Sequence, residues 1–208
     1  DGNVQGGGGF GAAIGGNTAS PMIERNIFRN NSCDTQHLSG VVAFVNGSSP
    51  QIVNNVFENN PCRAINLTLP QGNTLLIVNN TIVGNRTGIR LNLFGVQTQN
   101  YRNNIVVQNQ VGLDIEPNNG FVNSAWQNNL VFDNMTNNTT INYQGIIDQT
   151  GFNGNLSANP MFVNSAAGDY HLQAGSPAID TGSSVGAPSV DFDGTPRPFP
   201  VGGNWDIG

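Results

Sequence analysis

The ionisable side chains whose spacing best suits chemistry are Arg90, Asp114 and Glu116. Asp114 follows Arg90 by one interval of a sequence repeat, and Glu116 lies two positions further, on the same side of a strand. Two carboxyl groups beside a guanidinium can perform general acid–base catalysis on a glycosidic bond or hold a sugar. The simpler alternative is a solvated face whose surface ion pair contributes little.

The strands expected around these residues present two columns of outward side chains, because alternate residues of a strand face the same way. The first column is Val42, Asn66, Arg90 and Asp114, and the second is Phe44, Thr68, Asn92 and Glu116. Amides, a guanidinium and an aromatic ring are groups that contact sugars. The predicted ligand-binding residues are therefore Asn66, Arg90, Asn92 and Phe44.

The histidines offer little support for a β-eliminating lyase, which needs a strong base and a cation for the uronate carboxylate. The chain has no Lys, and His37, near Asp34, is the only His within the repeats. His37 is either such a base or a solvated loop residue. His171 is expected to pack in the C-terminal region.

A possible calcium site lies near the C-terminus, where Asp191 and Asp193 precede Gly194. Carboxylate oxygens are the ligands that calcium prefers, and Asp180 and Asp206 are further candidates. The alternative is that these carboxylates hydrogen-bond turns, for which an Asp-Gly pair is well suited. No other cofactor is indicated.

A repeat that positions these residues returns five times as Asn, two apolar residues, two further residues and Asn. Its copies are Asn26–Asn31, Asn55–Asn60, Asn80–Asn85, Asn104–Asn109 and Asn129–Asn134, at steps of 29, 25, 24 and 25 residues. Such regularity indicates stacked repeats rather than a disordered, low-complexity chain. The longer first step indicates a protruding loop at residues 35–39.

Columns of matching side chains between the asparagines indicate three short strands per repeat. Two apolar columns are Phe28, Phe57, Ile82, Val106 and Val131, and Ile23, Ile52, Ile77, Tyr101 and Trp126; a small-residue column is Gly11, Gly40, Ala64, Gly88 and Gly112. The chain is therefore predicted to be all-β, a single-stranded right-handed parallel β-helix with three strands per coil and about five coils. Residues 1–135 would form the coils, and residues 136–208 a C-terminal cap of the same domain that hides the open core and strand edge.

The two cysteines occupy equivalent positions of consecutive repeats. Cys33 and Cys62 each lie two residues after a ladder asparagine. Stacked positions in adjacent coils fall within the Cα distance that a disulfide requires, so the pair is either a disulfide or two buried thiols. A disulfide would agree with an oxidising compartment.

The charge and the distribution of apolar residues argue against nucleic acid and against membrane insertion. The 208 residues carry a net charge of −6, and only 10% of them are charged. Nucleic acid calls for a basic stripe that this chain lacks. No apolar run approaches the length of a membrane-spanning helix, so no membrane insertion is expected.

The chain resembles the secreted right-handed parallel β-helix repeat proteins of bacteria, the pectate-lyase-like superfamily in the broad sense. The coil unit Ser49-Pro-Gln-Ile-Val-Asn-Asn-Val-Phe57 is similar to their repeat. Their C-terminal pattern is matched by Asn159-Pro-Met-Phe, Asp169-Tyr-His-Leu, Gly175-Ser-Pro-Ala-Ile-Asp180, Asp191-Phe-Asp-Gly194, Arg197-Pro198 and Asp206-Ile-Gly208. The resemblance implies export to the extracellular space or cell surface, with a tail pattern that precedes anchoring segments in many members.

Two functions remain open, because the fold alone does not define one. The first is a non-catalytic module, a monomer or part of a larger chain, that binds a polysaccharide or cell-surface glycan or acts as an adhesive spacer. The second is a polysaccharide lyase or glycosidase that uses Arg90, Asp114 and Glu116.

Overall fold

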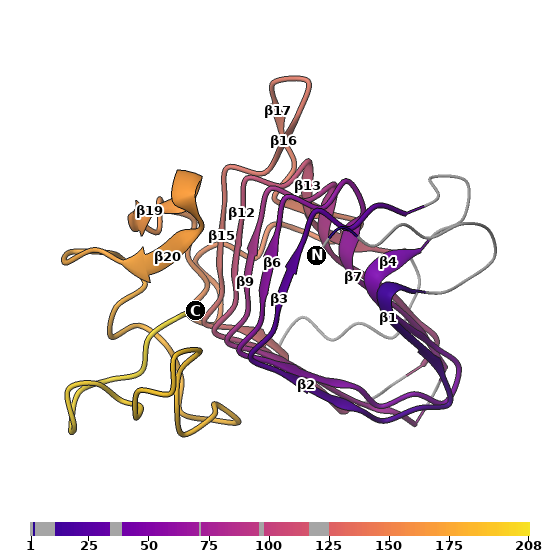
Figure 1. Cartoon of the computed structure of the whole chain (residues 1–208), viewed down its shortest axis with the longest axis horizontal. Coiled ribbons are helices and arrows are strands. Elements are labelled where there is room, and N and C mark those ends of the chain that lie inside the picture. Colours follow the sequence, from indigo (N-terminus) through magenta and orange to yellow (C-terminus); the bar gives the residue numbers. More distant parts are fainter. Residues whose placement is uncertain (1, 3–10, 34–38, 71, 96–97, 117–124) are drawn as a thin grey trace.

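The computed structural model describes residues 2, 11–33, 39–70, 72–95, 98–116 and 125–208. In these ranges the chain forms an all-β solenoid with three parallel sheets and almost no helix (Figure 1). Five successive strand triplets make about four turns from first to last, consistent with the predicted right-handed parallel β-helix. No helix of the described ranges is long and apolar enough to cross a bilayer.

Each sheet collects one strand from every coil. Sheet I contains, in spatial order, β1 (Gly11–Asn17), β4 (Gly40–Val45), β7 (Arg63–Leu69), β10 (Thr87–Leu93), β13 (Val111–Ile115) and β18 (Tyr143–Gln144). Sheet II contains β2 (Met22–Glu24), β5 (Gln51–Val53), β8 (Thr74–Val78), β11 (Thr98–Arg102) and β14 (Trp126–Gln127). Sheet III contains β3 (Ile27–Arg29), β6 (Val56–Glu58), β9 (Thr81–Val83), β12 (Ile105–Val107) and β15 (Leu130–Phe132).

The predicted apolar columns form the core of the solenoid. In sheet II the column that begins at Ile23 ends with Tyr101 beside Trp126, both fully buried. In sheet III, Phe28 stacks on Phe57 with ring centroids 4.8 Å apart. Each coil therefore shields the apolar side chains of its neighbours, and both column predictions are confirmed.

The asparagine ladders hold the coils together at two corners. Asn80 is typical: its Oδ1 accepts bonds from the Asn55 backbone N–H at 3.0 Å and from Asn55 Nδ2 at 3.1 Å. Its Nδ2 donates to the carbonyls of Ile52 and Val78. The position requires a short side chain that both donates and accepts, which Asn supplies and Asp or Leu does not.

Both ladders continue past Asn134, where the sequence pattern appeared to stop. Asn129 Nδ2 donates to Asn155 Oδ1 at 3.3 Å, and Asn134 Nδ2 donates to Asn142 Oδ1 at 3.0 Å. The second step spans only eight residues. The antiparallel hairpin of β16 (Met135–Thr136) and β17 (Thr139–Thr140) projects from the solenoid and returns the chain to the ladder (Figure 1).

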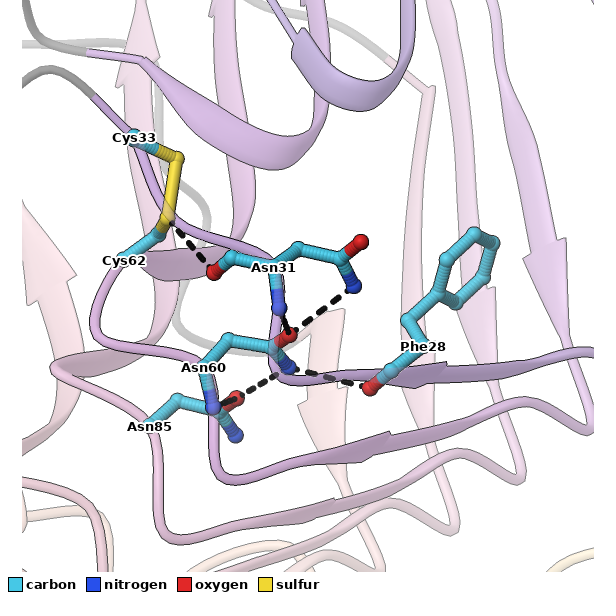
Figure 2. Close-up of a disulfide and its surroundings, with 6 residues drawn as sticks. All are labelled: Phe28, Asn31, Cys33, Asn60, Cys62 and Asn85. Carbon is cyan, nitrogen blue, oxygen red and sulfur yellow. Dashed lines mark hydrogen bonds between the residues drawn. A yellow bond between two sulfur atoms is a disulfide. The ribbon is translucent and has the colours of Figure 1, made fainter. Parts of the chain in front are cut away.

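The cysteines are joined in the structure, the first of the two alternatives for this pair. Cys33 and Cys62 have Cα atoms 5.6 Å apart and link the first two coils beside the second ladder (Figure 2). Residues 34–38, which include His37 and most of the predicted loop, lie outside the described residues, so these expectations stay predictions.

The C-terminal region has two parts. Tyr143 and Ile146 pack against the core at the end of the last coil. Residues 157–208, here called the strap, include the antiparallel strands β19 (Phe162–Asn164) and β20 (Asp169–Leu172) and the 3₁₀ turn η2 (Ser165–Ala167). The strap lies beside sheet III (Figure 1), where its Ala178 and Ile207 pack with Ile105 and Leu130.

The strap is needed at this flank because the outer face of sheet III is apolar in its later coils. In β9, β12 and β15 the middle residue points inward and its two neighbours point outward. The outward residues Val83, Ile105, Val107 and Leu130 are all buried. Burying an aliphatic side chain of this kind stabilises by roughly 1.5–3 kcal/mol. The strap therefore packs along this flank, and the cap predicted for residues 136–208 stays a prediction.

Candidate binding face on sheet I

The outer face of sheet I carries the predicted functional residues in two columns. Strand register aligns Ala43, Asn66, Arg90, Asp114 and Gln144 in one column. The next column contains Val45, Thr68 and Asn92, and continues to Glu116, whose backbone N–H donates to the Leu91 carbonyl at 3.0 Å. The parallel pairing of β7, β10 and β13 positions all of these side chains.

Arg90 gathers both acids, as the sequence predicted. Its Nε lies 3.2 Å from Asp114 Oδ2, and its Nη2 bonds Glu116 Oε1. The Arg90 side chain is only 6% exposed, whereas those of Asp114 and Glu116 are 19% and 37% exposed. The guanidinium is thus fixed against the sheet, and the carboxylates lie above it at the surface.

A second arginine adds positive charge at the same face. Burial and the nearby charge of Arg90 lower the pKa of Arg63 to about 10, Asp114 opposes this shift, and Arg86 adds to it. Arg63 begins β7, and Arg86 immediately precedes β10. Arg63 remains charged at neutral pH, so its guanidinium adds positive charge near Arg90 and Asp114.

The prediction that Phe44 faces outward is wrong. Phe44 is 1% exposed and pairs with Leu67, which in turn pairs with Leu91, so it belongs to the core; Val42 is also buried. The sequence alignment placed Gly40 with Ala64, but Gly40 pairs with Arg63. A slip of one residue moves every side chain of a strand to the opposite face.

The exposed ring on this face is Phe94, which sequence reasoning missed. It directly follows β10, whose last residue Leu93 is fully buried, and it is 57% exposed. Arg90, Asn92 and Phe94 alternate with Leu91 and Leu93. This two-residue period of a strand could have indicated that Phe94 faces outward with Arg90. Phe94, and not Phe44, is therefore an exposed ring next to these columns.

The predicted calcium ligands serve as hydrogen-bond acceptors within the strap. Asp191 Oδ1 accepts the Thr195 N–H at 2.7 Å, and Asp193 Oδ2 lies 3.0 Å from His171 Nε2. Asp180 and Asp206 likewise accept backbone N–H groups. Among the described residues, no group of three or more His, Cys, Asp and Glu side chains is placed to hold a metal ion. This geometry matches the alternative of turn-stabilising carboxylates, and calcium stays a hypothesis.

His171 lies at the surface between two carboxylates instead of packing inside. Its Nδ1 is 2.6 Å from Asp169 Oδ1, and its side chain is 69% exposed. Contacts with Asp169 and then Asp193 raise the pKa of His171. Both ring nitrogens face acceptor-only groups, an arrangement that favours the charged imidazolium. The residue links β20 to the loop at residues 191–195.

Comparison with protein-family models, with curated protein sequences and with solved structures finds no match to this chain. The fold places the chain in the class of parallel β-solenoids with asparagine ladders.

Proposed function

We propose that this chain is an extracellular, non-catalytic β-helix module whose sheet I face binds a glycan. The observation that carries the proposal is the row of outward side chains on β10, in which Asn92 lies between Arg90, held by both acids, and the exposed ring of Phe94. Planar polar groups can bond sugar hydroxyls, and an aromatic ring can pack on the apolar face of a pyranose.

Binding is favoured over catalysis because one guanidinium engages both acids. Asp114 and Glu116 each contact Arg90, so neither is presented as an unengaged proton donor or nucleophile. A polysaccharide-active enzyme, either a lyase or a glycosidase, is the second candidate. It is supported by the exposure of the Glu116 side chain, 37%, beside a second carboxylate.

An extracellular or cell-surface location is supported by the Cys33–Cys62 disulfide. Disulfides persist in oxidising compartments and are rare in the cytosol of most cells. The proposed partner is a polysaccharide or a cell-surface glycan, with the module acting as a monomer or as part of a larger chain.

The proposal is tested by affinity electrophoresis through gels containing plant, algal or bacterial polysaccharides. Retardation by at least one polysaccharide is expected, and Phe94→Ala should weaken it about three- to tenfold. Phe199→Ala is the matched control, because Phe199 is 69% exposed but lies in the strap. Equal retardation of both variants would exclude the sheet I face as the binding site.

Catalysis is tested with the same polysaccharides. Reducing ends and unsaturated products are measured for the wild type and for Asp114→Asn. A non-catalytic module releases neither product. Cleavage that the substitution abolishes would establish the enzyme instead.

A further inference from the structure

Two rows of corner residues run along the solenoid, one beside each ladder. Each ladder asparagine from the first five coils follows a residue with a left-handed backbone, at φ between 49° and 70°. The covered row, between sheets II and III, is Arg25, Asn54, Asn79, Asn103 and Asn128. The open row, between sheets III and I, is Asn30, Asn59, Gly84, Gln108 and Asp133.

The covered row binds the main chain of the strap. Asn128 Nδ2 donates to the Thr181 carbonyl, and Asn103 both donates to the Ser183 carbonyl and accepts the Ser183 N–H. Further along, Asn54 Nδ2 donates to the Val190 carbonyl and Arg25 Nε donates to the Phe192 carbonyl. Asn79 Nδ2 donates to the carbonyls of Asp206 and Gly208.

The spacing of these bonds explains how a row can hold a polypeptide. Consecutive coils contact carbonyls two residues apart, at Thr181 and Ser183 and again at Val190 and Phe192. The strap bends at Gly182 and turns at Phe192, so carbonyls two residues apart lie closer together than in extended chain and can reach consecutive coils. The row therefore recognises backbone, with little demand on side chains.

The open row has the same backbone geometry without such a cover. Asn30, Asn59 and Gln108 are exposed, and their side chains have no hydrogen-bond partner within the described ranges. Gly84 leaves space for the amide of its neighbour, since a Cβ there would lie 2.5 Å from Asn59 Oδ1. Several donors of the kind that hold the strap are thus accessible along one edge.

A cleft lies at the first two coils of the open row. Its lining includes Asn30 and Asn59 on one side and the turn from Ser165 to Gly168 on the other. Glu58, with a side chain only 9% exposed, also lines the cleft; its Oε2 accepts the Tyr170 hydroxyl at 2.7 Å and its Oε1 lies 3.8 Å from Arg29 Nη1. The cleft thus offers amide donors for carbonyls, whereas its carboxylate is already engaged by Tyr170.

We propose that the open row and this cleft bind an irregular polypeptide segment of a partner protein, like residues 181–192 of the strap, through its main chain. The segment would have small side chains, as residues 181–190 of the strap do. A polypeptide is favoured over a glycan because the covered row already shows this row geometry paired with backbone carbonyls. This site is separate from the sheet I face and does not depend on the glycan proposal.

The test uses NMR of the ¹⁵N-labelled protein titrated with a synthetic peptide of residues 181–192. The side-chain amide signals of Asn30 and Asn59 should shift, whereas those of buried Asn54 and Asn79 should not. A peptide of scrambled sequence should bind within about threefold of the original, because hydrogen bonds to the main chain carry the contact. No shift at the open row, or complete loss of binding on scrambling, would overturn the proposal.

The matched variants are Asn59→Gly and Asn138→Gly. Both residues are exposed asparagines with a left-handed backbone, at φ 52° and 62°, which glycine adopts without strain. Asn59→Gly should weaken peptide binding about three- to tenfold, the effect of one lost hydrogen bond, and Asn138→Gly should not change it. Equal effects would overturn the site, as would shifts at Asn30 and Asn59 caused by a neutral oligosaccharide but not by the peptide.

Discussion

The covered row and the open row share a backbone conformation and differ in what lies over them. Asn54, Asn79 and Asn103 are at most 2% exposed because the strap crosses them, whereas Asn30, Asn59 and Gln108 face solvent. Asn is favoured at both rows for the same local reason, since it tolerates the left-handed conformation. Local conformation thus selects the residue type, and packing decides whether its side chain contributes to stability.

The largest effect is expected at the ladders behind the two rows. Asn80→Ala and Asn85→Ala each remove a fully satisfied buried amide and leave several backbone groups without partners. Each substitution should lower the free energy of unfolding by about 3–5 kcal/mol. Denaturant unfolding measures both. If the losses for the two variants differ by more than about 2 kcal/mol, the two edges of the solenoid differ in their ladders as well as in the strap that covers one of them.

The rows themselves should respond unequally to glycine, which keeps the left-handed backbone. Asn103→Gly loses two bonds to Ser183 and one to Asn79, so a loss of about 1–3 kcal/mol is expected. Asn59→Gly should change stability by less than about 0.5 kcal/mol, as surface substitutions usually do. Equal losses in denaturant unfolding would contradict the claim that the strap makes the difference.

The smallest effect is expected at His171, which joins β20 to the loop at residues 191–195 within the strap. The raised pKa of His171 stabilises the folded state below the ordinary histidine pKa, and this contribution is lost as pH rises through the raised value. The lowered pKa of Asp169, caused chiefly by its bond to His171, adds stability above the ordinary aspartate pKa that is lost on acidification. The contact should therefore stabilise most between these two limits.

Thermal melting at weakly acidic and alkaline pH, compared with His171→Asn, isolates this contribution. The wild type should lose a small part of its Tm advantage over the variant above neutral pH. The imidazole pKa, measured by NMR, should lie above that of an unfolded control. An unchanged pKa would contradict a stabilising contact of His171 with Asp169 and Asp193.

The sequence predicted most of the solenoid because its period records contacts between identical positions. Asn55, Asn80 and Asn104 stack as the spacing required, and Ile52, Ile77 and Tyr101 fill one inward column. Arg90, Asp114 and Glu116 also meet, since one repeat of 24 residues separates Arg90 from Asp114. These features depend only on stacking equivalent residues of adjacent coils.

Features that do not follow the sequence repeat were not predicted. Asn142 joins its ladder after eight residues instead of a full coil, because a hairpin intervenes. Phe44 was assigned to the wrong face because the small-residue pattern around Gly40 fits two registers, one residue apart. Phe94 could have been found from the alternation of β10, but its exposure depends on which side faces the core.

The sequence by itself determined the stacked coils, their ladders and the inward columns, since each is a contact between repeated positions. Only the tertiary structure decided where residues 157–208 lie. Their bonds join strap carbonyls to Arg25, Asn54 and Asn128, more than fifty positions away, and no periodicity encodes main-chain partners of that kind. The exposure of the asparagines in each corner row follows from that placement, because left-handed Asn54, Asn79 and Asn103 are buried on one edge while left-handed Asn30 and Asn59 are exposed on the other.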